Sequence, residues 1–530
     1  MTITFRDRTT ILAVLAVTAI ACVATPRAAI AQTPAAASIR EQVRGYRMSH
    51  DVPIVRELAD FLALPNLASD SVNIRRNADH LMGMLRSRGI TTRLLESSSG
   101  GPPAVYGELR TPGATKTIVF YAHYDGQPVD TAQWVTPPWS VVLRDKPLDA
   151  KGAVIPIPTT PGTMQGEWRL YARSSSDDKA PIVAMLAAID ALRSAKVQPT
   201  VNLKFFFDGE EEAGSPHLRD ILTHNLQLLD ADAWIFGDSP VHQSRKQLIL
   251  FGVRGVGQVD ITVYGPSHGL HDGHYGNWAP NPVTEIANLV ASMRNDDGRI
   301  LIKNFYDDVS PITAAERKAI ASAPSIDSAM RVETQLGATE ANDAPLVERI
   351  MLPGLNLRGI RGGNVGALAS NTIPTEATAS IDFRLVPKQT PEHVRQLVEA
   401  HIRSRGYFIV DHTPTPSERM AHGKIAKLTW DAGYPATRVP MDSPLARAVI
   451  RSVEDGLGAS VVTLPTMGGS LPLYDFESVL KKPLIVLPIV NHDNNQHSSN
   501  ENVRLQNLFD GIEVYAGVLA RLGGYWVPRA

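Results

Sequence analysis

Acidic residues and histidines follow short apolar runs at several places in this sequence. The side chains at these positions that could do chemistry are His123, Asp125, Glu210, Glu211, Glu212, Asp238 and His497. Two further acids, Asp177 and Asp178, precede an apolar helical pattern that begins near Pro181. Acids and imidazoles gathered in one place could bind a metal ion or transfer protons. The question is therefore whether the fold brings them together.

A cluster of this composition is best explained by bound cations. Carboxylates in one partly dry place repel one another, and each loses hydration when it is buried. Imidazole and carboxylate without thiolate suit Zn²⁺ and also Mn²⁺ or Co²⁺. Two histidines and three acids, one of them shared, would suit two ions about 3.5–4 Å apart that activate a bridging water. A carboxylate that is not a ligand could take the proton of that water. The alternative interpretation is a set of solvated surface acids.

The elements that must position these side chains are predicted to be buried strands. The apolar runs are TIVFYA at 117–122, VNLKFFF at 201–207, DAWIF at 232–236 and PLIVLP at 483–488. Helical patterns lie between several of them, which favours an α/β domain with a doubly wound, largely parallel sheet. Ligands of such sheets bind beyond the carboxyl ends of the strands, so we expect the polar residues to converge at one edge.

The segment 251–429 has a different pattern. QVDITVYG at 258–265 and ASIDFRLVP at 379–387 alternate between apolar and polar residues, as strands with one exposed face do. We therefore predict a smaller α+β domain, inserted into a larger domain whose two parts are residues 32–250 and 430–530.

The N-terminus predicts a secretory signal peptide over residues 1–31. Two arginines precede an apolar run at 11–24, and Ala29-Ile30-Ala31 suits cleavage before Gln32. We expect a secreted, periplasmic protein without a stable membrane span. An uncleaved N-terminal anchor and lipid anchoring at Cys22 are the alternatives. Cys22 is the only cysteine, so the mature chain offers no thiolate and can form no disulfide. A net charge of −2 gives no reason to expect nucleic acid as a partner.

Five polar motifs occur in a fixed order along the chain. They are HYDGQPVD from 123, ARSSSDDKAP from 172, DGEEEAGS from 208, FGD from 236 and QHSSNEN from 496. Together they resemble the motifs of the M20 family of co-catalytic metallopeptidases, most closely its carnosinase-like dipeptidase branch. The resemblance covers nearly the whole mature chain.

The resemblance implies a role for each matching residue. The implied ligands of two zinc ions per subunit, with Mn²⁺ or Co²⁺ as substitutes, are His123, Asp177, Glu212, Asp238 and His497. Asp177 would bridge the ions, Asp125 would orient the ring of His123, and Glu211 would be the general base. Glu210 would be structural or solvated.

The inserted domain resembles the lid of this family, which carries the dimer contact. His271 would reach the partner's active site and stabilise the oxyanion, and an ordinary histidine-rich surface loop is the alternative. Substrate contacts are implied for Arg384, Thr372, Gly469 and Ser470. Arginine suits this task because its fork can bind a carboxylate at two points.

Three features depart from the family pattern. Ser174 and Ala180 replace glycines that are usual in the family, and we expect alanine to be tolerated unless its φ angle is positive. An insertion between Leu143 and Trp168 precedes the Asp177 loop, and it would either rim the active site or be decoration.

These residues and motifs favour a metal-dependent exopeptidase, a dipeptidase or carboxypeptidase, that hydrolyses peptides as a homodimer. An N-acyl-amino-acid deacylase needs the same site and is the alternative. A non-catalytic metal-binding or peptide-binding protein on the same scaffold is a third interpretation, and the intact ligand set together with Glu211 argues against it.

Overall fold

The structure is a computed structural model that describes residues 35–471 and 473–527. The predicted signal peptide, including Cys22, lies outside the described residues. No helix in the described part of the chain is both long and apolar enough to cross a membrane.

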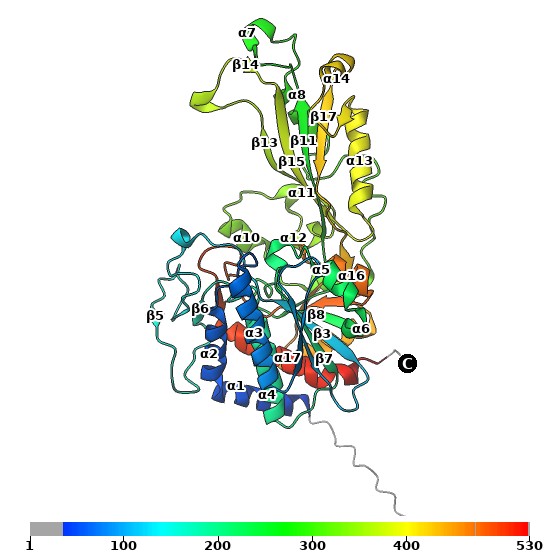
Figure 1. Ribbon diagram of the computed structural model, residues 1–530. Helices are drawn as coiled ribbons and strands as arrows, with labels where there is room; N and C mark the ends of the chain where they lie inside the picture. Colours follow the sequence, from blue (N-terminus) through cyan, green and yellow to red (C-terminus); the bar gives the residue numbers. More distant parts are fainter. Residues whose placement is uncertain (1–34, 472, 528–530) are drawn as a thin grey trace, which may run out of the picture. The chain divides into compact units, whose positions relative to one another are not determined.

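An eight-stranded sheet forms the centre of the α/β part (Figure 1). Its strands, in spatial order, are β1 (Thr91–Leu95), β2 (Ala104–Leu109), β7 (Asn202–Asp208), β3 (Thr117–His123), β8 (Ala233–Phe236), β20 (Leu484–Val486), β9 (Leu248–Leu250) and β19 (Val462–Leu464). The four central strands β7, β3, β8 and β20 are parallel, and these are the four apolar runs from which the sheet was predicted.

The prediction of a largely parallel sheet is wrong at the edges, and the sheet is mixed. β1, β2 and β7 pair antiparallel, and β20 pairs antiparallel with β9. The short connection 96–103 between β1 and β2 explains the first of these, because a parallel pair needs a crossover of a dozen or more residues.

Both faces of the sheet are buried. Ile118, Phe120 and Ala122 of β3 belong to one hydrophobic cluster, and Val119 and Tyr121 belong to another, because successive side chains of a strand point to opposite faces. The helices on the first face are α1 (Ala36–Ser49), α2 (Asp51–Leu62), α3 (Ser71–Ser87), α4 (Lys179–Ser194), α15 (Pro444–Leu457) and α17 (Leu505–Tyr525). The helices on the second face include α5 (Leu218–His224), α6 (Leu226–Leu229) and α16 (Leu473–Leu480).

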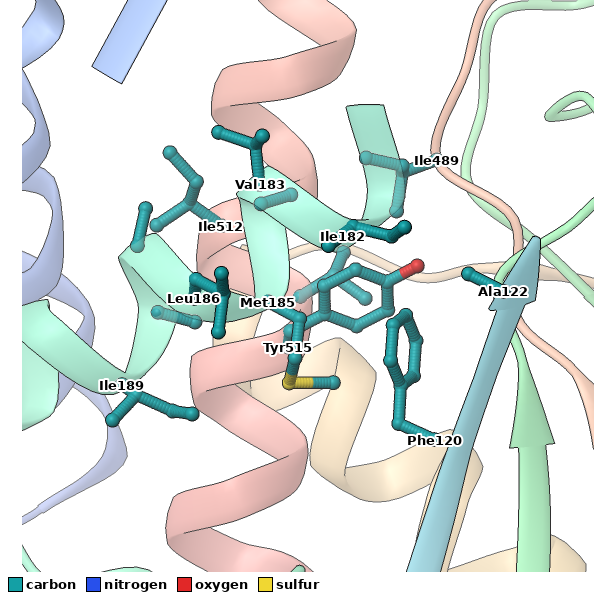
Figure 2. Packing of buried hydrophobic residues seen from close by; sticks show 14 of the residues in the cluster. Phe120, Ala122, Ile182, Val183, Met185, Leu186, Ile189, Ile489, Ile512 and Tyr515 are labelled. Atoms are coloured by element: carbon teal, nitrogen blue, oxygen red, sulfur yellow. The ribbon is translucent and has the colours of Figure 1, made fainter. Parts of the chain in front are cut away.

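The strand β3, which ends at the polar residues, packs against α4 and α17. Figure 2 shows Phe120 of β3 packed beside Tyr515 of α17 and the apolar side chains of α4, and the two ring centroids are 5.1 Å apart. The Tyr515 hydroxyl donates a hydrogen bond to the Leu487 carbonyl oxygen, 3.2 Å away. Full burial of such side chains stabilises the fold by roughly 1.5–3 kcal/mol each, so this packing stabilises the strand that ends at His123.

A five-stranded sheet is built from residues within the segment predicted to be inserted. Its strands, in spatial order, are β13 (Gly354–Arg361), β15 (Glu376–Leu385), β11 (Gly255–Tyr264), β17 (Ile425–Trp430) and β16 (Phe408–Val410). Helices α8 (Pro282–Ala291) and α13 (Pro391–Ser404) cover it and share a third hydrophobic cluster with it (Figure 1). Two residues of the same segment, Ala315 and Ala319 of α9 (Ala314–Ser322), pack instead against the first cluster of the eight-stranded sheet.

The shorter elements of this segment lie in its connections. They are β10 (Gly252–Val253), β12 (Leu270–His271), α7 (Asp272–Tyr275), α10 (Asp327–Glu333), α11 (Glu340–Asp343), α12 (Leu346–Arg349), β14 (Thr372–Ile373) and α14 (Pro416–Ala421). β10 pairs with β18 (Thr437–Arg438), and β12 pairs with β14.

The insertion between Leu143 and Trp168 forms part of a four-stranded sheet. The order of its strands is β21 (Asn502–Arg504), β6 (Arg169–Tyr171), β4 (Val142–Arg144) and β5 (Val154–Ile155). Buried Asp51 at the start of α2 accepts hydrogen bonds from the backbone N–H groups of Gly162 and Met164, at 2.9 and 3.2 Å. The insertion is therefore paired at β5 and anchored at Gly162 and Met164.

Candidate metal centre

The strand register brings the polar residues to one edge of the eight-stranded sheet. Tyr121 of β3 pairs with Phe236 of β8, so His123 and Asp238 each lie two residues beyond that pair. His123 itself pairs with Asp208, the last residue of β7. A single turn of 3₁₀-helix, Glu211–Ala213, follows β7. The predicted convergence at the carboxyl ends of the parallel strands is therefore present.

The Asp177 carboxylate lies between two imidazoles. His123 Nε2 is 2.9 Å from Asp177 Oδ1, and His497 Nε2 is 3.1 Å from Asp177 Oδ2. His497 Nε2 is also 3.3 Å from Glu212 Oε2. One carboxylate thus offers an oxygen to each histidine, which is the arrangement that a bridging ligand needs.

Asp125 connects the histidine to the glutamate turn. One of its carboxylate oxygens, Oδ1, lies 3.3 Å from His123 Nδ1 and accepts a hydrogen bond from the Glu211 backbone N–H at 3.1 Å. The other, Oδ2, accepts from the Glu212 backbone N–H at 3.0 Å. The side chain is fully buried. Asp125 therefore fixes the His123 ring and the backbone that carries both glutamates.

Two groups of side chains in the described residues could each hold an ion. The first consists of His123, Asp177 and Glu212, and the second of His123, Glu211 and Asp238. His497 belongs to neither group, but it contacts Asp177 and Glu212 directly. All five predicted ligands and Glu211 thus lie in one connected cluster.

The acids of the cluster hold protons readily when no cation is near. Burial raises the pKa of Glu212 to about 8, with the Asp177 charge adding to the effect. Burial likewise raises the pKa of Asp238 to about 7 and the pKa of Glu211 well above its usual range. Burial also raises the pKa of Asp178, whose two carboxylate oxygens have no hydrogen-bond partner within the described part of the chain. These shifts indicate a site with more acid than the protein itself neutralises.

The pKa values of the two histidines are also raised, which favours their charged form, whereas the raised pKa values of the acids favour the neutral form. Burial disfavours the imidazolium of His123, but contacts with Asp125 and Asp177 hold its pKa well above the usual value. Hydrogen bonding to Asp177 raises the pKa of His497 to about 9. Burial alone would raise the pKa of Asp177, yet its contacts with the two histidines lower it. The contacts with acids thus favour positive charge at both imidazoles, and a donor set of imidazole and carboxylate fits a divalent ion such as Zn²⁺.

Glu210 differs from its two neighbours. It is buried, and its Oε1 accepts a hydrogen bond from the His217 backbone N–H at 2.8 Å. Its Oε2 lies 2.9 Å from the His217 ring nitrogen Nδ1. Of the two roles expected for it, the structure supports the structural one and excludes the solvated one.

The predicted substrate residues fall into two sets. Arg384 Nη1 donates a hydrogen bond to Ser470 Oγ at 2.9 Å, which joins the five-stranded sheet to the Gly469–Ser470 loop. His271 and Thr372 pair with each other across β12 and β14, and both are exposed. Within the described part of the chain, no hydrogen bond or ion pair connects His271 to the metal-site cluster.

Glu501 is a residue of the site that the sequence reasoning missed. Its side chain is fully buried and accepts five hydrogen bonds from the loop that leads to Asp177. The signal was available, because Glu501 belongs to the QHSSNEN motif that contains His497.

The backbone conformation differs between the two positions, 174 and 180, at which glycine is replaced. Ser174 has a φ angle of 61°, the left-handed region that favours glycine. Its hydroxyl accepts a hydrogen bond from Asn66 Nδ2 at 2.8 Å. Ala180 lies in the first turn of α4 and has no positive φ angle, so the expectation that alanine is tolerated there is confirmed.

Comparisons with known proteins found one family model and several related metallopeptidases. A family model described as "Peptidase family M20/M25/M40" matches residues 119–521. A Cys-Gly metallodipeptidase of Schizosaccharomyces pombe is 27% identical over 78% of this chain and 81% of its own length. The human Beta-Ala-His dipeptidase is 26% identical over 78% of this chain and 76% of its own. The crystal structure of an M20 family metallo-carboxypeptidase from Sulfolobus solfataricus covers 89% of this chain and 99% of its own, with 25% identity and a TM-score of 0.71.

Proposed function

The chain belongs to the peptidase family M20/M25/M40 and is a metal-dependent hydrolase of that type, and we propose that it is an exopeptidase that cleaves dipeptides or C-terminal residues. The observation that carries this proposal is the Asp177 carboxylate shared between His123 and His497, with Glu211 beside them. The names of the fission yeast and human relatives, both dipeptidases, support small peptides as substrates.

Two metal ions would be held by overlapping sets of ligands. His123, Asp177 and Asp238 would hold one ion, and Asp177, Glu212 and His497 would hold the other. When bound, such a pair of ions polarises the scissile carbonyl and lowers the pKa of a shared water.

Glu211 moves the proton in the proposed reaction. Its carboxylate takes a proton from the attacking water and later delivers it to the leaving amine nitrogen. Asp125 holds it in place through the hydrogen bond from the Glu211 backbone N–H.

The substrate's terminal carboxylate would be bound by Arg384 and the Gly469–Ser470 loop. The hydrogen bond from Arg384 Nη1 to Ser470 Oγ brings these two side chains together, which supports this proposal. His271 and Thr372 would contact the substrate from a second copy of the chain, in a homodimer formed through the lid.

The proposal is tested by assaying the zinc-loaded protein against a dipeptide library and against N-acetyl and N-succinyl amino acids. We expect hydrolysis of dipeptides, and Glu211→Gln should lower kcat by about 10²–10⁴-fold with metal content unchanged. Preference for the N-acyl compounds would identify a deacylase instead. Peptide binding without turnover would identify a binding protein, and full activity of metal-loaded E211Q would refute the role of Glu211.

We also propose that the protein is exported with cleavage of residues 1–31. Fractionation of the producing cells and N-terminal sequencing of the mature protein test this. An N-terminus at Gln32 in the periplasmic fraction is expected, and a lipid-modified N-terminus at Cys22 would identify the anchored alternative.

A further inference from the structure

The loop that carries Asp177 has little regular structure of its own. It connects β6, which ends at Tyr171, to α4, which begins at Lys179. Its residues are buried, so their polar backbone groups need partners inside the protein. The position of the Asp177 carboxylate therefore depends on the groups that accept hydrogen bonds from the N–H groups of this loop.

One carboxylate accepts hydrogen bonds from three backbone N–H groups of this loop, those of Ser174, Ser176 and Asp177. Glu501 Oε2 accepts hydrogen bonds from Arg173 Nη1 and the Ser174 backbone N–H, each at 2.8 Å. Glu501 Oε1 accepts from the Ser176 backbone N–H, the Ser176 hydroxyl and the Asp177 backbone N–H, each at 2.9 Å. Five donors thus converge on a single fully buried side chain.

Glu501 also belongs to the other half of the site. It follows His497 by four residues in the chain and directly precedes β21, which pairs with β6. Arg173, whose charge lies beside Glu501, also donates to the Ser498 carbonyl oxygen at 3.2 Å. The loop of His497 and the loop of Asp177 are therefore joined at this carboxylate.

We propose that Glu501 is a positioning residue for the metal centre, and that it sets the Asp177 carboxylate between His123 and His497. Glu501 touches neither histidine and would act only through the backbone and side-chain donors of the Asp177 loop. The inference rests on the proposed function, because it assigns this loop the task of presenting a shared metal ligand.

The substitution Glu501→Gln tests the proposal with little change of shape. An amide has one oxygen, and its NH₂ group is itself a donor. Each oxygen of Glu501 receives at least two donors, so the NH₂ group faces donors in either orientation. Loss of an outer partner of a metal ligand typically weakens metal binding about 10–100-fold, and we expect that loss of Zn²⁺ affinity here.

Glu513→Gln is the matched control. Glu513 of α17 is also buried, and its carboxylate accepts hydrogen bonds from Arg44 and Arg47 at 2.7–3.2 Å. Both substitutions remove a buried negative charge beside arginine, so both are expected to lower the melting temperature of the metal-free protein. Only E501Q should weaken zinc binding, measured by competition with a chromophoric chelator on the purified full-length protein.

The outcomes separate this inference from the proposed function. If the wild-type protein binds none of Zn²⁺, Mn²⁺ and Co²⁺, the proposed function fails and this inference fails with it; if it binds Mn²⁺ or Co²⁺ in place of zinc, the same competition is run with that ion. If the wild type binds zinc and folded E501Q binds it equally well, or E513Q weakens binding as much, only the inference is refuted. If E501Q does not fold, Ser176→Ala decides, because it removes one donor and keeps the carboxylate. Weaker zinc binding by S176A supports the inference, and unchanged binding refutes it.

Discussion

Glu210, Glu211 and Glu212 are adjacent in the chain but occupy three different environments. Glu210 turns away to His217, Glu211 lies beside His123 and Asp238, and Glu212 lies beside Asp177 and His497. The Glu212 side chain is only 4% exposed and also accepts a hydrogen bond from Gln127 Nε2 at 2.6 Å. Equal charges in sequence therefore do not imply equal roles.

Substitution of each outer glutamate should separate metal binding from stability. Glu212→Gln removes a ligand and should weaken Zn²⁺ binding by more than the roughly 100-fold seen for outer-shell partners. Glu210→Ala should lower the free energy of unfolding by about 1–3 kcal/mol, because it leaves the His217 backbone N–H without its partner. Metal titrations and denaturant melts of both variants check this. Normal zinc affinity in E212Q, or weakened zinc affinity in E210A, would contradict the assignment.

Zinc binding should release protons and strengthen as the pH rises. His497, with a pKa of about 9, and Glu212, with a pKa of about 8, are largely protonated at pH 7 in the metal-free protein. Protons compete with the metal below these values, so each displaced proton changes the affinity by about tenfold per pH unit. Calorimetry at pH 7 in buffers of different ionisation enthalpy measures the protons released. An affinity that is constant from pH 6 to 8, without proton release, would show that these ligands are already deprotonated.

At the scale of elements, one buried acid, Asp51, anchors the insertion at Gly162 and Met164. Asp51→Ala removes the acceptor for Gly162 and Met164 and should free the segment 156–165, with a loss of about 1–3 kcal/mol of stability. Limited proteolysis should then cut in that segment. Asp70→Ala is the control, because it removes the cap of α3 at the Asn73 backbone N–H, for about 1 kcal/mol, without touching the insertion. Equal cleavage rates in the two variants would mean that other contacts hold the insertion.

The sequence predicted the elements that are marked by a pattern of consecutive residues. The four central strands are short, mainly apolar runs, and the residues at and after the ends of β3, β7 and β8 converge because parallel strands place their ends together. The antiparallel pairs β2–β7 and β6–β21 could not be predicted, because each joins segments that lie far apart in the chain. Glu501 stands in the QHSSNEN motif, but its role was missed because its five donors belong to a distant loop.

At the scale of the whole molecule, the site of one chain is incomplete as proposed. His271 lies on an exposed turn, and its ring Nδ1 accepts a hydrogen bond from the Gly273 backbone N–H at 3.0 Å. Tyr275 and Trp278 nearby are exposed by 41% and 79%, which is unusual for large aromatic side chains and suits a surface that a second copy covers.

Mixing two inactive variants should restore activity if His271 acts across the dimer. In a heterodimer of Glu211→Gln and His271→Ala, the H271A subunit keeps its own Glu211 and receives His271 from its partner, so one of the two sites is complete. Random reassortment makes half of the dimers mixed, which gives about a quarter of the wild-type activity in a symmetric dimer. If His271 acts within its own chain, neither site of the heterodimer is complete and the mixture stays inactive. Each variant alone, taken through the same dissociation and reassociation, is the control, and light scattering verifies that the mixture is dimeric.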